Sequence, residues 1–155
     1  MTRNGWCALT LAVALLPAIA FAQRRGDFTA TLVVTDRLDG PTLHAAKTAV
    51  RGEVVWAVIL FSHCAADAHA RCRAVADFTV LRPDGSVYDS HEGAEVWSAM
   101  PPRRKTPQLS SARLGVHFRP GDPLGRYRIR AVVKDLEAKR SVTLERALVV
   151  TASSR

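Results

Sequence analysis

The sequence predicts an all-β fold, a single antiparallel β-sandwich of about seven strands, on three observations. Apolar and polar residues alternate with a period of two in several segments rich in Val and Thr, as in residues 27–36. Turn sequences separate these segments, among them Arg82-Pro83-Asp84-Gly85 and residues 120–125. No long segment after residue 23 has a convincing helical pattern, and short strands at this spacing are typical of a sandwich.

The expected strands cover residues 27–36, 53–61, 74–81, 86–89, 109–118, 125–134 and 141–151. The first is the half-buried strand just described. Residues 37–51 carry the turn signal Asp39-Gly40-Pro41 and are expected to form a connection, with room for a short helical turn at 44–49.

The segment 53–61 is the most apolar part of the chain after residue 23. Val55 and Ile59 have one parity and Trp56 and Val58 the other, so both faces of the strand are apolar. A strand of this kind is normally covered on both sides. The outer face of a sandwich strand usually meets water, so we expect a loop, another chain or a ligand to cover this one.

A hairpin is expected at residues 74–89, because Arg82-Pro83-Asp84-Gly85 has Pro at its second position and Gly at its fourth. Residues 90–107 show no regular strand pattern. Such a long irregular segment is uncommon in a compact domain and indicates a functional or mobile loop.

A corner of the sandwich is predicted after Phe118. Pro123 presets the backbone for a turn, and Gly125 takes the last position of that turn. Asp122 is placed to accept backbone N–H groups. Tyr127 is expected to be buried, with its hydroxyl bonded to a backbone group across the corner.

The two strands that follow the corner differ in regularity. Residues 125–134 alternate cleanly, with Tyr127, Ile129 and Ala131 directed inward. Residues 141–151 change parity near Arg146, which shares a face with apolar side chains. A β-bulge there would restore the register.

The first 22 residues are typical of a secretory signal peptide. Arg3 precedes an apolar run over residues 8–20, and Ala20-Phe21-Ala22 fits a cleavage site. The run is shorter than the roughly 20 apolar residues of a membrane span. We therefore expect one exported domain over residues 23–155, periplasmic or secreted, without a transmembrane span.

Two cysteines remain after cleavage, since Cys7 leaves with the signal peptide. An even number of cysteines in an exported chain predicts a disulfide, Cys64 to Cys72. The closed loop is short, so the expected stabilisation is only about 2–3 kcal/mol. An alternative uses the same loop: with His63 and His69, the two thiolates would form a copper or zinc site. With the disulfide formed, the two histidines would bind copper more weakly, alongside Met100 or His91.

The chain is basic, with a formal net charge of +8. Such a charge favours anionic partners, although a soluble protein without such a partner has the same composition. Three arginines of the strand 125–134 face outward and form a candidate anion-binding face: Arg126, Arg128 and Arg130. Arg113 and Arg119 have the same outward parity on the preceding strand, so we add them to this face. The structural alternative is a solvated face with cross-strand partners such as Glu145. Aromatic residues are absent from it, which argues against single-stranded nucleic acid.

Residues 95–105 combine Trp, Met and Arg, which are the residue types that anchor protein interfaces. The candidate contact residues are Trp97, Met100, Arg103, Arg104 and Lys105. In the structural alternative, Trp97 folds back over the apolar outer face of the strand 53–61.

These motifs together resemble a known family. The hairpin 82–86, a strand ending in Phe118-x-Pro120, and the pattern Asp122-x-x-Gly125-x-Tyr127 are similar to those of bacterial extracytoplasmic immunoglobulin-like domains, including the macroglobulin type. The resemblance spans residues 77–133. It implies an immunoglobulin-like sandwich with a binding, adhesion or spacer role, and fold alone specifies no partner. Cys64 and Cys72 lie between consecutive strands, so they cannot form the sheet-to-sheet disulfide of antibody domains.

No enzyme motif is present in the sequence. His91-Glu92-Gly93 lacks the second histidine of a zinc protease helix, Gly85-Ser86 is a turn, and there is no glycine-rich phosphate loop or cofactor signature. The sequence thus predicts a non-catalytic binding or accessory module of the bacterial cell envelope. It would contact another protein or an anionic component through residues 90–107 and the basic face.

Overall fold

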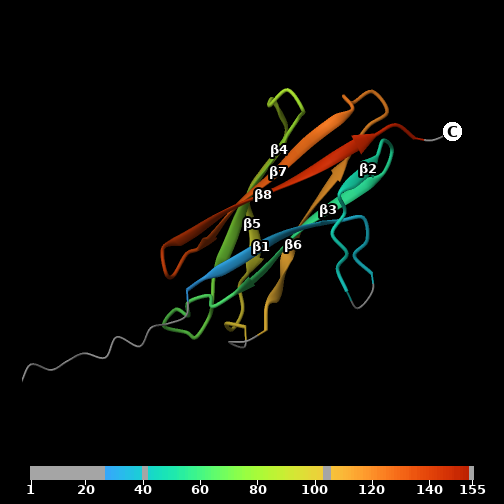
Figure 1. Ribbon diagram of the computed structural model, residues 1–155. Coiled ribbons are helices and arrows are strands. Elements are labelled where there is room, and N and C mark those ends of the chain that lie inside the picture. Colours follow the sequence, from blue (N-terminus) through green and yellow to red (C-terminus); the bar gives the residue numbers. More distant parts are fainter. Residues whose placement is uncertain (1–26, 40–41, 103–105, 154–155) are drawn as a thin grey trace, which may run out of the picture.

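Two β-sheets packed face to face make up the computed structural model, which describes residues 27–39, 42–102 and 106–153 (Figure 1). The strands are β1 (Thr29–Thr35), β2 (Thr48–Val50), β3 (Val54–Ser62), β4 (Ala74–Leu81), β5 (Val87–Trp97), β6 (Gln108–His117), β7 (Gly125–Asp135) and β8 (Arg140–Thr151). The predicted all-β sandwich is confirmed. The predicted signal peptide, residues 1–22, lies outside the described residues.

The smaller sheet has the strand order β1-β3-β6 and the larger sheet the order β2-β8-β7-β4-β5. All pairings are antiparallel except that of β2 with β8, which is parallel. The core lies between the sheets and follows the alternation of the central strands. On β7 the side chains of Tyr127, Ile129, Ala131 and Val133 are fully buried, as the sequence pattern predicts for the first three.

Two segments expected to be irregular are strands. Residues 48–50 form β2, which overlaps the end of the segment 44–49 where we allowed a helical turn. β5 runs to Trp97, so the prediction of an irregular segment is wrong for residues 90–97. Its sequence does not alternate, because β5 is an edge strand that is mostly exposed and bulged against β4. Asp77 on β4 stabilises the bulge, since its carboxylate accepts the N–H of Gly93 at 2.9 Å and pairs with Lys134.

The bulge predicted near Arg146 is also wrong. β8 pairs with β7 in an unbroken register from Arg140 to Val150. At Arg146 β8 is the outermost strand of its sheet in the described part of the chain, because β2 pairs only with residues 149–151. The side chain therefore reaches solvent at the rim of the sandwich without any change of register.

The outer face of β3 is only partly shielded from solvent, since Trp56 and Leu60 are half-buried and Val54 is exposed. Val58 is fully buried there, opposite Val33 of β1 and Arg113 of β6. Trp56 lies over Gly115 of β6, so closely that a Cβ added to this glycine would be 2.9 Å from the Trp56 ring. The alternative in which Trp97 covers this face is wrong: Trp97 packs against Phe61, which belongs to the core, with ring centroids 5.8 Å apart.

The corner before β7 has the predicted polar contacts. Tyr127 is buried and donates its hydroxyl hydrogen to the Pro123 carbonyl at 2.9 Å. Asp122 accepts the Arg119 N–H at 2.6 Å. The hydrogen-bonded turn lies three residues earlier than predicted, at 119–122 instead of 122–125, because the Asp122 N–H bonds to the Arg119 carbonyl and Pro120 takes the second position. Gly125 has a φ of +127°, which only glycine adopts readily.

Candidate functional site

A concave site lies at the end of the sandwich opposite the corner, where the cysteine loop leaves β3. The predicted disulfide is confirmed: Cys64 and Cys72 are bonded, with their Cα atoms 5.8 Å apart. Inside the loop, the Asp67 carboxylate accepts the N–H groups of His69 and Arg71, each at 2.8 Å. The Arg71 bond is the main cause that lowers the pKa of Asp67. The loop is therefore cross-linked and internally hydrogen-bonded.

Asp135, at the end of β7, joins the cysteine loop to the β7–β8 turn. Its side chain is buried; one carboxylate oxygen accepts the Ala65 N–H at 2.8 Å, and the other accepts the N–H groups of Glu137 and Ala138, both at 3.1 Å. Buried backbone donors need such partners. The sequence predicts a turn after this strand, but we did not predict that Asp135 would accept these hydrogen bonds. The available signal was an Asp at the end of a strand, directly before a turn, where its side chain can accept backbone N–H groups.

The segment after β5 is tied to the same loop. The Cys72 N–H bonds to the Ala99 carbonyl at 2.8 Å, and the Arg71 guanidinium donates to the Ser98 carbonyl at 2.9 Å. The indole N–H of Trp97 donates to the Met100 carbonyl at 2.9 Å. Three segments distant in sequence thus hold one another in place.

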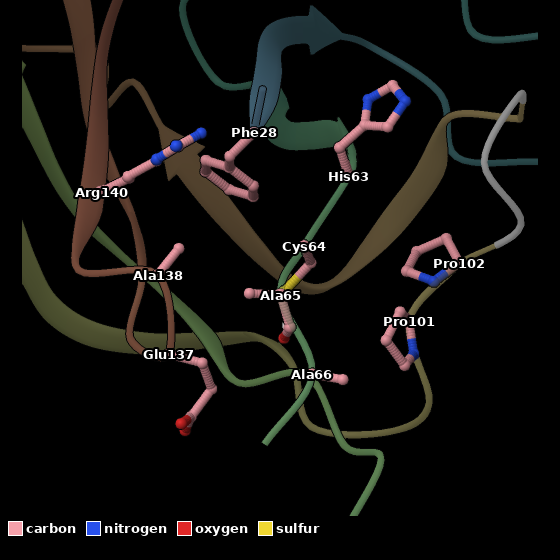
Figure 2. Close-up of a pocket in the computed structure, with 10 residues that line it drawn as sticks. All are labelled: Phe28, His63, Cys64, Ala65, Ala66, Pro101, Pro102, Glu137, Ala138 and Arg140. Carbon is pink, nitrogen blue, oxygen red and sulfur yellow. Dashed lines mark hydrogen bonds between the residues drawn. The ribbon is translucent and has the colours of Figure 1, made fainter. Parts of the chain in front are cut away.

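Together these segments enclose an open cavity of about 480 Å³ (Figure 2). Figure 2 shows Arg140 and Phe28 on one side of it, Pro101 and Pro102 on the other, and Cys64 and Ala65 between them. The remaining lining residues are His63, Ala66, Glu137 and Ala138. We refer to this as the disulfide-end cavity.

The polar side chains of the cavity already have partners. Arg140 donates to Asp27 at 3.0 Å, and Glu137 lies 3.9 Å from Arg73. The His63 imidazole Nδ1 is 3.2 Å from Ser62 Oγ.

The predicted contact residues of 95–105 are distributed differently from expectation. Trp97 is half-buried and packs on the core, whereas the Met100 side chain is 73% exposed beside the cavity prolines. Arg103, Arg104 and Lys105 lie outside the described residues.

Arg126, Arg128 and Arg130 lie on the outer face of β7, as predicted. The predicted alternative, a cross-strand pairing of these arginines with Glu145, is also present. The Glu145 carboxylate is 3.9 Å from Arg128 and 3.2 Å from Arg130. Arg113 and Arg119 do not extend this face, because β6 belongs to the other sheet and Arg119 follows β6. Shared parity on consecutive strands does not place side chains on one surface when the chain changes sheet.

The metal alternative loses its thiolate ligands to the disulfide. His63 lines the cavity and His69 is exposed on the loop. Over the described ranges, no group of three or more His, Cys, Asp or Glu side chains is arranged to hold a metal ion.

Comparisons with known proteins bear on the fold alone. No family model matches the chain, and no curated protein matches it. Among solved structures it is similar to a family 123 glycoside hydrolase from Clostridium perfringens, with a TM-score of 0.50 and 10% identity, over 82% of this chain and 28% of that one. This similarity supports the β-sandwich.

Two smaller proteins show weaker similarity. The CARDB domain of a Pyrococcus furiosus protein has a TM-score of 0.45 and 12% identity, over 81% of this chain and 88% of that one. A Niemann-Pick type C2 protein from Japanese carpenter ant has a TM-score of 0.47 and 8% identity, over 80% and 91%. The class of fold, given by the two packed sheets themselves, is a β-sandwich, and the narrower resemblance to macroglobulin-type modules stays a prediction.

Proposed function

We propose that this chain is an exported, non-catalytic binding module of the bacterial cell envelope, and that it contacts another protein at the disulfide-end cavity. The observation that carries the proposal is the construction of that cavity. A disulfide and a buried carboxylate with three backbone hydrogen bonds hold its walls. Walls ordered before binding reduce the entropy lost on association.

The size and lining of the cavity suit recognition. Its volume of about 480 Å³ is within the range of roughly 300–1,000 Å³ typical of ligand sites. An aromatic ring, two prolines and the disulfide supply apolar surface, and Arg140, Glu137 and His63 supply polar groups. Met100 adds an exposed, adaptable side chain at the margin, a residue type enriched in interfaces.

A binding role fits the polar groups better than catalysis does. Ser62 and His63 form a hydroxyl–imidazole pair near the cavity, but Ser62 Oγ also lies 2.6 Å from Thr29 Oγ1. In the part of the chain that the structure describes, no carboxylate hydrogen-bonds to the His63 ring. A hydrolytic serine needs a base held in place by such a third group.

Two observations support export. The first 22 residues have the pattern of a signal peptide, and the disulfide is of a kind that persists in oxidising compartments. Across the described residues, no helix meets the length and hydropathy needed to cross a bilayer.

The basic face of β7 has a secondary role in binding, because Glu145 pairs with Arg128 and Arg130 and neutralises part of its charge. Of the three arginines on this face, Arg126 is the one that forms no ion pair with Glu145 in the described structure.

Site-specific photo-crosslinking tests the proposal. A photoreactive amino acid at Met100, beside the cavity, is expected to capture a discrete envelope protein in intact cells. The same substitution at Leu124, which is 47% exposed at the opposite end of the sandwich, is the matched control. Capture at position 124 alone, or at neither position, would contradict the proposal.

A further inference from the structure

The contacts of Arg140 point to a specific ligand chemistry for the disulfide-end cavity. We propose that the cavity binds a carboxylate joined to an apolar group, and that its source is the C-terminal residue of a partner protein. This inference rests on the proposed function and names the part of the partner that enters the site.

Arg140 already holds a carboxylate. Its guanidinium donates to Asp27 Oδ1 at 3.0 Å, and the two residues are 113 positions apart in the sequence. The Asp27 side chain is 91% exposed and that of Arg140 is 52% exposed. Exposed ion pairs of this kind add little stability, so an incoming carboxylate can displace Asp27. Asp27 thus occupies the position on Arg140 that we assign to the ligand.

The other cavity charges leave Arg140 as the anion-binding group. Glu137 is an acid and lies near Arg73, which is not among the lining residues. His63 is next to the Ser62 hydroxyl. Arg140 is the only guanidinium among the cavity residues of the described structure, and the net charge of +8 favours the approach of an anion.

The apolar half of the cavity lies beside this guanidinium. Phe28 is 6% exposed and Cys64 is 7% exposed, so both present the edge of the core to the cavity. Figure 2 shows the Arg140 side chain next to the Phe28 ring, with Pro101 and Pro102 opposite. A ligand that satisfies both halves needs a carboxylate and an apolar side chain on neighbouring atoms.

The C-terminal residue of a protein meets this requirement in one unit. Its α-carboxylate and its side chain leave the same carbon atom, whereas an internal Asp or Glu uses its side chain for the charge. The cavity volume of about 480 Å³ exceeds what a carboxylate alone would fill and leaves room for an aromatic or branched side chain. Capture of a C-terminal carboxylate is an established mode of peptide recognition.

Titration with three probes, monitored by backbone amide NMR shifts and calorimetry, tests the inference. The probes are acetyl-Ala-Phe with a free carboxylate, the same peptide with a C-terminal amide, and octanoate. The free peptide is expected to shift the amides of Ala65, Ala66 and Ala138. The amide should bind about tenfold more weakly, since it lacks the charge-assisted bond to Arg140.

Three variants accompany the probes. Arg140→Gln should weaken binding of the free peptide about tenfold and abolish the difference between acid and amide. Arg146→Gln, at an exposed position of β8 that does not line the cavity, is the matched control and should change nothing. Asp27→Asn should strengthen binding about twofold to fivefold, because it removes the competing carboxylate.

The outcomes separate the hypotheses. Equal binding of acid and amide, shifts confined to other surfaces, or no shift at millimolar peptide would overturn the inference. Octanoate binding more tightly than the peptide, with the same dependence on Arg140, would reject a protein C-terminus as the source. If crosslinking at Met100 succeeds while the peptide fails, the proposed function stands and only the ligand chemistry is wrong.

Discussion

The Tyr88 hydroxyl donates to Asp122 Oδ2 at 2.6 Å and so ties the edge strand β5 to the corner between β6 and β7. The same carboxylate oxygen accepts the Arg119 N–H, and the Tyr88 hydroxyl also lies 2.7 Å from the His117 carbonyl. The Tyr88 ring stacks on Phe118 and meets Tyr127 edge-on. These contacts of Tyr88, between β5 of the larger sheet and the corner that follows β6, therefore close this end of the sandwich.

Replacing Tyr88 with Phe should reduce stability and its dependence on acid. Burial alone would raise the pKa of Asp122, but the hydrogen bonds from Tyr88 and Arg119 outweigh it and hold the pKa below the ordinary value of 3.8. A lowered pKa in the folded state stabilises the protein above the ordinary pKa, and this contribution disappears as the pH falls through the folded value.

We expect Tyr88→Phe to lose about 2 kcal/mol of unfolding free energy at pH 7 and less at pH 2, measured by urea denaturation. For Asp122→Asn, the loss of unfolding free energy should likewise be smaller at pH 2 than at pH 7. Equal losses for Tyr88→Phe at both pH values would contradict the assigned hydrogen bond.

Both tyrosines of the chain should ionise at a higher pH in the folded protein than in the unfolded chain. Burial, followed by the Asp122 hydrogen bond, raises the pKa of Tyr88 to about 12, and burial is also the main cause that raises the pKa of Tyr127. Phenolate absorbance at pH 10.5 should therefore be low in the native state and high in urea. Because both folded pKa values are raised, the stabilisation is complete below pH 10 and is lost as the pH rises toward about 12. Native phenolate absorbance equal to that in urea would refute this.

Substitution of Asp135 should reduce the stability of the protein more than substitution of most other polar residues. Asp135→Ala would leave three backbone N–H groups without their acceptor at a buried site, and we expect a loss of about 3 kcal/mol or more in urea unfolding. Asp67→Ala is the matched control, since that carboxylate also accepts two backbone N–H groups but at the exposed tip of the cysteine loop, and its loss should be smaller. Similar losses would mean that the Asp135 contacts add nothing beyond those of an exposed turn.

Gly115→Ala should disturb the outer face of β3. The added Cβ would lie 2.9 Å from Trp56 Cζ3, so the indole or the backbone must move, and overpacking of this kind destabilises by about 1–3 kcal/mol. The Trp56 emission should shift to the red as the ring leaves the sheet. Gly121→Ala, where a Cβ meets nothing within 4 Å, is the control and should preserve both stability and emission.

The sequence pattern was informative where the local environment repeats along a strand. The alternation of β7, the turn 82–85 and the buried Tyr127 follow from period-two burial and from the backbone preferences of Pro and Gly. The disulfide followed from two cysteines in a chain that carries a signal-peptide pattern. None of these predictions depends on which strand lies beside which.

The sequence by itself therefore determined the class of fold, most strand positions, the corner and the disulfide. The tertiary structure decided which sheet each strand joins, and with it the separation of Arg113 from the β7 arginines. It also decided that residues 90–97 form an edge strand, because exposure on both faces removes the alternation that would reveal it. The disulfide-end cavity is likewise formed only by the tertiary structure. The Asp27–Arg140 and Asp135–Ala65 contacts that build it join residues 113 and 70 positions apart, and a local sequence pattern contains no information on contacts at such separations.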